Sequence, residues 1–251
     1  ISVSDIMDTS HHQIDANLDQ EEVARQFERY NLFSMPVVDQ DKRLLGVVMI
    51  DDIVDVINEE AEEDIHRLGG VGDEALTDTG LNITKSRFTW LAINLFTAIL
   101  ASIVINMFDA TINEKVALAV LMTVVASMGG NAAVQTMTVS VRALATKELT
   151  PVNALRIVSR EGMVGVINGV LFAVVTGLVT LVWFKSTGLA LIMGAAMIFN
   201  MIIAGLAGIL IPILLERFKI DPAVASSVFV TTVTDVFGFF SFLGLAALFL
   251  V

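Results

Sequence analysis

The sequence has 251 residues, of which 55% are hydrophobic, and its formal net charge is −12. It contains no cysteine, which excludes disulfides and thiolate metal sites. The mean hydropathy of +0.76 is far above that of an ordinary globular domain, and long apolar blocks of about 20 residues indicate membrane-spanning helices.

Charge divides the chain into two parts. Residues 1–84 hold 5 Lys and Arg against 20 Asp and Glu, whereas residues 85–251 hold 10 against 7. An acidic part of this kind attracts cations and repels nucleic acid, so we predict two domains with different roles and no nucleic-acid partner. Because the chain begins with Ile1, we interpret it as a fragment whose N-terminal part is missing.

Residues 1–57 are predicted to form one α/β unit with the element order β-α-β-β-α. Asp19 is the expected N-cap of its first helix, and a second helix is expected to start with Asp51 or Asp52 as its cap. Two strands lie between these helices, in SMPVVDQD and RLLGVVMI. Helical spacing places Val23, Phe27 and Tyr30 on one face of the first helix.

This unit resembles a CBS domain. CBS units work as tandem pairs, so we expect this to be the C-terminal unit of a pair whose partner lies in the missing part. Many CBS domains bind adenine nucleotides through a G-x-x-T-x-x-D segment, which here reads GVVMIDD. Gly46 and Asp52 fit that segment, but Met49 replaces the hydroxyl residue, so nucleotide binding by this unit is doubtful.

Residues 58–86 are expected to form an acidic connecting helix between the two domains. Five acids lie within six positions: Glu59, Glu60, Glu62, Glu63 and Asp64. Most of these side chains are expected on a solvated helix face. Like charges at i,i+4 destabilise a helix, however, so the cluster also suggests a screening divalent cation held by oxygen ligands, Mg²⁺ or Ca²⁺.

Residues 87–251 are predicted to form a five-helix transmembrane domain. The predicted spans are at about 87–108, 115–145, 161–184, 188–215 and 222–251. With the N-terminus in the cytoplasm, eight Lys and Arg flank the spans inside and two flank them outside. The positive-inside rule therefore predicts a cytoplasmic N-terminus and an external C-terminus.

An acid and a row of hydroxyls stand out in the fifth span. Asp235 falls near the bilayer midplane, where a carboxylate costs about 2.5–3.5 kcal/mol on insertion scales. No basic residue lies inside a span to pair with it. Helical spacing places Ser227, Thr231, Asp235 and Gly238 in one polar or small stripe, which is typical of a pore lining.

Side-chain amides of Asn and Gln occur in or near other predicted spans. Asn131 and Gln135 share one helix face in the second span, directly after Gly130. They are either ligands that orient a hydrated cation or hydrogen-bonding groups between helices, and the pattern alone does not decide. Four other asparagines are expected to bond between helices: Asn94, Asn106, Asn168 and Asn200.

Four stretches of the sequence resemble parts of one known family. GGNAAVQTMTVSVRALAT, DPAVASSVFVTTVTDVFG, the CBS unit and EEAEEDIHRLGGV together resemble the MgtE magnesium transporters. The resemblance implies an α-helical membrane protein with five spans per subunit, preceded by a CBS unit and a connecting plug helix. It also implies a homodimer in the cell (inner) membrane that conducts Mg²⁺ along the dimer axis and is closed by cytosolic Mg²⁺.

The resemblance also assigns residues to roles. Asp235 corresponds to the pore aspartate, the metal site of the pore, and Gly130, Asn131, Gln135, Ser227 and Thr231 would line that pore. The cytosolic Mg²⁺-sensing acids would be Asp39, Asp41, Asp51, Asp73 and Glu74.

The expected function is thus a Mg²⁺-selective channel gated by cytosolic Mg²⁺, with Mg²⁺ as the bound ion and Co²⁺ as another possible divalent cargo. The alternatives are a proton-coupled divalent-cation transporter and a membrane sensor without transport. An enzyme is not expected, because a second intramembrane acid and a Ser/His pair are both missing.

Overall fold

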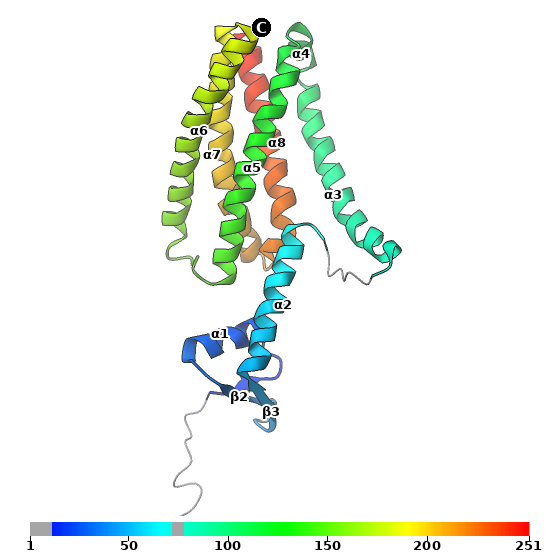
Figure 1. The fold of residues 1–251 in the computed structure, drawn as a ribbon, viewed down its shortest axis with the longest axis vertical. Helices are drawn as coiled ribbons and strands as arrows, with labels where there is room; N and C mark the ends of the chain where they lie inside the picture. The colour runs from blue at the N-terminus through cyan, green and yellow to red at the C-terminus, as the bar shows by residue number, and fades with distance from the viewer. Residues whose placement is uncertain (1–11, 72–77, 251) are drawn as a thin grey trace, which may run out of the picture. The chain divides into compact units, whose positions relative to one another are not determined.

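The first part of the chain folds into an α/β unit in the computed structural model, which describes residues 12–71 and 78–250, without the side chains of 224–226. Its elements are β1 (Ile14–Asp15), α1 (Gln20–Tyr30), β2 (Ser34–Val38), β3 (Leu44–Met49) and α2 (Ile50–Leu68) (Figure 1). β1 pairs in parallel with β2, and β2 pairs antiparallel with β3. The predicted β-α-β-β-α order is confirmed.

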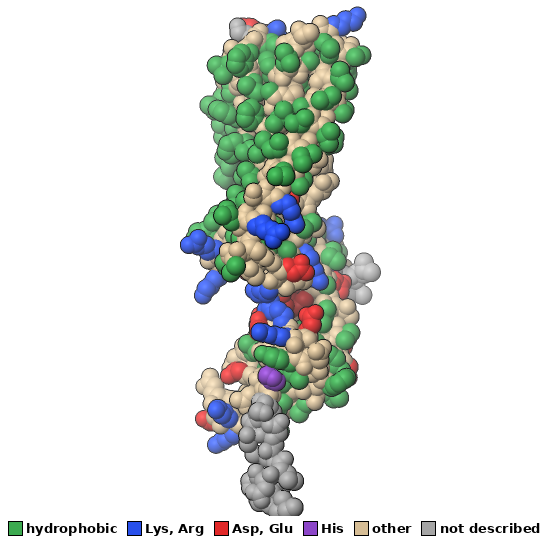
Figure 2. All heavy atoms as spheres, turned by 90° about the vertical axis from the view of Figure 1, so that its left-hand side faces the viewer, with side chains coloured by type: hydrophobic (Ala, Val, Ile, Leu, Met, Phe, Trp, Pro, Cys, Tyr) green, Lys and Arg blue, Asp and Glu red, His purple; other side chains and the backbone are tan. Residues whose placement is uncertain are grey.

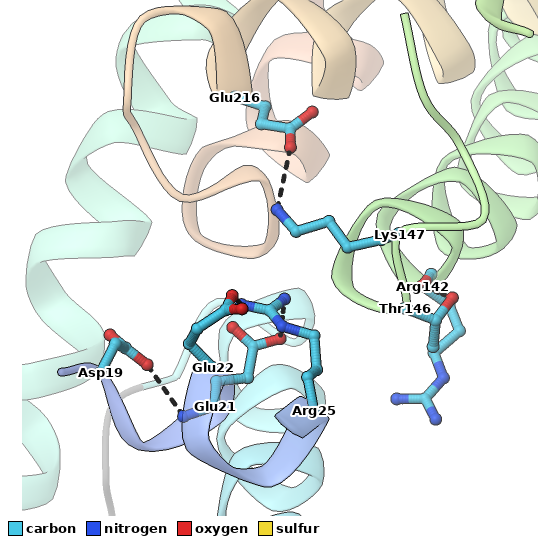
Figure 3. Close-up of polar contacts among 8 residues, drawn as sticks. All are labelled: Asp19, Glu21, Glu22, Arg25, Arg142, Thr146, Lys147 and Glu216. Carbon is cyan, nitrogen blue, oxygen red and sulfur yellow. Dashed lines mark hydrogen bonds and ion pairs between the residues drawn. The ribbon is translucent and has the colours of Figure 1, made fainter. Parts of the chain in front are cut away.

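Helix α1 begins where the sequence predicts. The Asp19 side chain accepts a hydrogen bond from the backbone N–H of Glu21 at 2.9 Å, so it caps the helix (Figure 3). Val23 and Phe27 are buried. Tyr30, at the end of the same face, is 43% exposed. It occupies the last turn of α1 and stacks on His12 with ring centroids 4.1 Å apart.

Helix α2 continues through the acidic stretch without interruption. Asp51 and Asp52 lie inside its first turn, where carboxylates favour the positive end of the helix dipole, rather than at its N-cap. Asp52 still reaches back, because its Oδ2 accepts a bond from the Met49 N–H at 3.0 Å. The chain divides into two compact units, Ile1–Ile65 and His66–Val251, so a single helix contributes to both.

Within the described residues of the second unit, five helices are long and apolar enough to cross a membrane, as predicted. They are α3 (Gly80–Asn106), α5 (Ala117–Ala145), α6 (Ala154–Phe184), α7 (Thr187–Arg217) and α8 (Pro222–Phe249). Helices α3 and α6 begin earlier than predicted, because a polar or charged first turn is compatible with a helix that extends beyond the hydrocarbon core. A short helix, α4 (Asp109–Glu114), follows α3 and was not predicted.

Helix α7 lies between α5, α6 and α8 and is the most buried of the five spans (Figure 1). Its contact with α6 depends on small residues. A Cβ added at Gly165 of α6 would lie 2.8 Å from the backbone oxygen of Met201. Such close backbone approach is how helices associate in a bilayer, where no hydrophobic effect drives them together. Helix α3 packs chiefly on α8 and leaves most of its surface uncovered.

The outer surface of the five-helix unit is that of a membrane protein. Hydrophobic side chains cover the face seen in Figure 2, and basic side chains gather at one end of the unit. The exposed Lys and Arg on the α5–α6 connection, the start of α6 and the end of α7 are Arg142, Lys147, Arg156, Arg160, Arg217 and Lys219. Lys147 pairs with Glu216 at 3.6 Å (Figure 3).

Candidate ion-binding site

Helices α5 and α8 carry the predicted pore residues, and they pack directly against each other (Figure 1). The contact is close at Gly130, where an added Cβ would lie 4.0 Å from the Thr234 hydroxyl. Thr234 is completely buried and precedes Asp235 on α8. The glycine pair of α5 therefore lies at the height of the acid in α8.

The amides of α5 point away from the bundle core. Asn131 and Gln135 are both exposed in the single chain, whereas Ala133, between them, is fully buried. An exposed amide within a span must find a polar partner, because lipid tails offer no hydrogen bond. This face of α5 is therefore suited to a second protein surface or to a water-filled passage.

Asp235 lies half-buried on α8, and Thr231 and Ser227 are half-buried one and two turns before it, respectively. No ion pair among the described residues involves Asp235. The Thr231 hydroxyl donates to the backbone oxygens of Ser227 at 2.9 Å and Val228 at 3.2 Å. Since its proton is used within the helix, its oxygen can only accept, as a carboxylate does. Acceptor oxygens beside an acid suit a hydrated cation.

The fourth member of the predicted stripe faces elsewhere. Gly238 is buried, and an added Cβ there would lie 3.1 Å from the Asn200 Nδ2 of α7. Gly238 is thus covered by α7, because a contact between helices, and not helical spacing, decides which part of a face is covered. The half-buried part of the stripe consists of Ser227, Thr231 and Asp235.

Three predicted sensing acids lie at opposite ends of the β2–β3 hairpin. Asp39 and Asp41 are in its turn, where the Asp39 Oδ1 accepts from the Arg43 N–H at 2.8 Å. Asp51 follows the far end of β3. Five steps of about 3.4 Å along the strand put roughly 17 Å between the two ends. One ion cannot bind to all three acids of the same chain.

The remaining sensing acids, Asp73 and Glu74, lie outside the described residues. Within residues 12–71 and 78–250, no group of three or more His, Cys, Asp or Glu side chains is placed to hold a metal ion.

The α/β unit contains a cavity of about 260 Å³ beside the predicted nucleotide segment. Apolar side chains such as Ile14, Val37 and Val48 form most of its wall, and Asp15 and Asp52 supply carboxylates. One oxygen of Asp52 is engaged by the Met49 N–H.

Two features of the site were not predicted from the sequence. Arg67, in the last turn of α2, forms an ion pair with Asp221, whose other oxygen caps α8 by accepting from the Ala223 N–H at 2.8 Å. Asn200 of α7 was expected to bond between helices, and its Nδ2 does donate to the Val125 backbone oxygen at 2.6 Å. The packing of its side chain against Gly129 and Gly238 was not predicted from the sequence.

Taken together, five helices within residues 78–250 that are long and apolar enough to cross a membrane, and an α/β unit of CBS type, define a multi-pass membrane protein. Residues 122–245 match the family model of MgtE, described as a divalent cation transporter, and residues 3–59 match that of the CBS domain. The chain is therefore similar to proteins of the MgtE family over both of its parts.

Three curated relatives carry the name magnesium transporter MgtE. Those of Bacillus subtilis and Enterococcus faecalis are each 33% identical, over 249 and 248 residues, and that of Thermus thermophilus is 34% identical over 252 residues. Each alignment covers 99% of this chain but 55–56% of the relative, so the chain spans about half the length of these proteins. The CBS match lies at the N-terminal end of this chain, so its description as a C-terminal unit is not matched.

Proposed function

We propose that this protein transports Mg²⁺ across the cell membrane as a homodimeric channel, with α5 and α8 lining the pathway and Asp235 binding the ion. The observation that carries the proposal is that two helices which pack on each other both carry polar groups within a span: exposed amides at Asn131 and Gln135 on α5, and half-buried Asp235 on α8, for which the described residues provide no ion pair. Three relatives named as magnesium transporters support the choice of ion.

Charge balance explains how an acid is tolerated there. Mg²⁺ dehydrates reluctantly and keeps several waters in octahedral geometry, so it suits a wide site of acceptor oxygens. Two copies of Asp235 on a shared axis would supply a charge of about −2 to an ion of +2. Asn131 and Gln135 would orient the waters around that ion, and the spacing of these oxygens would set selectivity.

The test is ion uptake by liposomes that contain the reconstituted protein. Asp235→Asn and Asp235→Ala are expected to abolish Mg²⁺ uptake, whereas Asp109→Asn, which changes an exposed acid in α4, should leave it intact. Uptake by both Asp235 variants at the parental rate would contradict the pore assignment. Uptake that stops when a pH gradient is dissipated would instead favour proton-coupled transport.

Regulation by cytosolic Mg²⁺ is the second part of the proposal. The acidic unit would lie in the cytoplasm, with the C-terminus outside, and ions bound at its carboxylates would favour the closed state. Because a strand roughly 17 Å long separates Asp39 and Asp41 from Asp51, we expect two separate ion positions on this unit.

Separate positions predict separable effects on closure. Neutralising Asp39 and Asp41 together, or Asp51 alone, should each raise the Mg²⁺ concentration that closes the channel, and the triple variant should add the two shifts. Asp55→Asn, an exposed acid on α2, is the control. An unchanged closing concentration in the triple variant would overturn the sensing role without touching the assignment of Asp235.

A further inference from the structure

Helix α7 carries an amide in the interior of the bundle. Asn200 is 1% exposed, and its Nδ2 donates to the Val125 backbone oxygen of α5 at 2.6 Å. Its Oδ1 is buried and has no hydrogen-bond partner among the described residues. A buried acceptor left unpaired costs about 1–3 kcal/mol, so stability alone would favour an apolar side chain of similar size here.

Glycines of both neighbouring helices make room for this side chain. A Cβ added at Gly129 of α5 would lie 2.1 Å from Asn200 Nδ2 and 2.7 Å from its Cγ. A Cβ added at Gly238 of α8 would lie 3.1 Å from the same Nδ2 and 3.2 Å from Oδ1. The amide therefore occupies the space that side chains would otherwise take on α5 and on α8.

Both glycines lie close to the proposed ion ligands along their helices. Gly129 precedes Asn131 by two residues, which is about 3 Å along the axis of α5. Gly238 follows Asp235 by three residues, or about 4.5 Å along α8. One rigid amide thus contacts, within a single helical turn, both helices that carry the proposed ion ligands.

We propose that Asn200 is a positioning residue of the ion pathway, which holds α5 and α8 at the separation that makes the site selective for Mg²⁺. The inference rests on the proposed transport function. Mg²⁺ holds its first-shell oxygens at 2.0–2.1 Å in octahedral geometry and Ca²⁺ holds its own at 2.3–2.6 Å, so the two hydrated ions differ in size by a few tenths of an ångström, and a shift of that size between the helices that hold the hydration shell matters. The bond to Val125 also fixes the amide in direction, which an apolar side chain cannot reproduce.

The first experiment separates positioning from stability. Liposomes with the parent or with Asn200→Leu are assayed for Mg²⁺ and Ca²⁺ uptake, and melting temperature is measured in detergent. We expect Asn200→Leu to melt at or above the parent, yet to lower the ratio of Mg²⁺ to Ca²⁺ uptake at least 5-fold. An unchanged ratio overturns the proposal, whether or not both rates fall with the amount of folded protein.

Thr180→Val is the matched control. Thr180 of α6 is also 1% exposed, and its hydroxyl is buried without a partner among the described residues, but it contacts neither glycine. Its substitution removes a buried unpaired polar group and should leave the uptake ratio at the parental value. A change equal to that of Asn200→Leu would show a general response to core substitution and overturn the specific role.

A double-mutant cycle tests the contact itself. Gly129→Ala should lower both melting temperature and Mg²⁺ uptake, because its new methyl overlaps the amide. Combining it with Asn200→Ala should restore at least part of the melting temperature, and additive losses would overturn the proposal. The melting temperatures of this cycle are measured without transport. They therefore test the Asn200 contact separately from the proposed function, which Asp235→Asn tests. Mg²⁺ uptake that survives Asp235→Asn would contradict the proposed function and leave the result of the cycle unchanged.

Discussion

A methyl group added at Gly208 should force α7 away from α5. Gly208 is buried in α7, and a Cβ there would lie 2.6 Å from the Ala133 backbone oxygen, 2.8 Å from the Thr136 Cβ and 3.0 Å from the Met137 backbone nitrogen. Two of these atoms belong to the backbone and the third is next to it, so no rotation of a side chain can relieve the overlap. The helices must move apart by several tenths of an ångström.

Two effects of the substitution have opposite signs. Ala is favoured over Gly within a helix by about 0.8–1.0 kcal/mol. Overpacking a tight interior costs about 1–3 kcal/mol, and the upper part of that range applies where backbone atoms resist. Gly208→Ala should therefore destabilise the bundle by about 1–2 kcal/mol. It should also slow Mg²⁺ uptake, because the displaced segment of α5 carries Asn131 and Gln135 on its other face.

Thermal unfolding in detergent, followed by tryptophan fluorescence, measures the first effect. Gly162→Ala is the matched control, since its Cβ would meet only the flexible Leu206 Cδ2 at 3.5 Å. It gains the helix propensity without the overlap and should melt at or above the parent temperature. If Gly208→Ala melts as high as Gly162→Ala, the argument from backbone overlap is refuted.

Three further predictions concern helix ends. Asp221→Ala removes the α8 cap and the ion pair with Arg67, so it should lower stability by about 1 kcal/mol for the cap and at most about 1 kcal/mol for the partly exposed pair. Asp221→Asn should keep the cap and lose only the pair. A melting temperature of Asp221→Asn equal to the parent's would exclude a role for the pair, and equal melting temperatures of the two variants would exclude a role for the cap. Asp19→Ala should cost about 1 kcal/mol of α1 stability, read from urea unfolding by circular dichroism, and no change would contradict its role as cap. Asn31 ends α1 in the left-handed conformation, at φ 50°. Asn31→Val should therefore lower the urea midpoint of α1, whereas Asn31→Gly should not, because glycine adopts this conformation without strain. A lower midpoint for Asn31→Gly than for Asn31→Val would refute the role of the left-handed cap.

The elements of the fold could be read from the sequence because each has a local cause. Apolar runs longer than 20 residues have no stable alternative to a membrane span, so all five were predicted. Asp19 ahead of an amphipathic run likewise predicted the start of α1. Helix ends were less predictable, as the early starts of α3 and α6 show, because a polar turn can be helical or not according to its surroundings.

Side-chain direction was predicted where helical spacing alone decides it. Asn131 and Gln135 share an exposed face because they are four residues apart. Helical spacing did not reveal that Gly238 is buried against Asn200 of α7, or that Tyr30 is 43% exposed, because the burial of a residue depends on contacts outside its own helix. The hairpin likewise separated Asp39 and Asp41 from Asp51, although all three are close in sequence.

The sequence by itself determined the class of protein, the number of spans and the position of an acid in the fifth of them, because hydropathy and helical period are local properties of the chain. Only the tertiary structure decided which groups meet. It set the Asn200 amide between Gly129 and Gly238 and joined Arg67 to Asp221. Asn200 and Gly129 are 71 positions apart in the sequence, and Arg67 and Asp221 are 154 positions apart. Such pairings follow from how helices pack, and no spacing within a single helix encodes them.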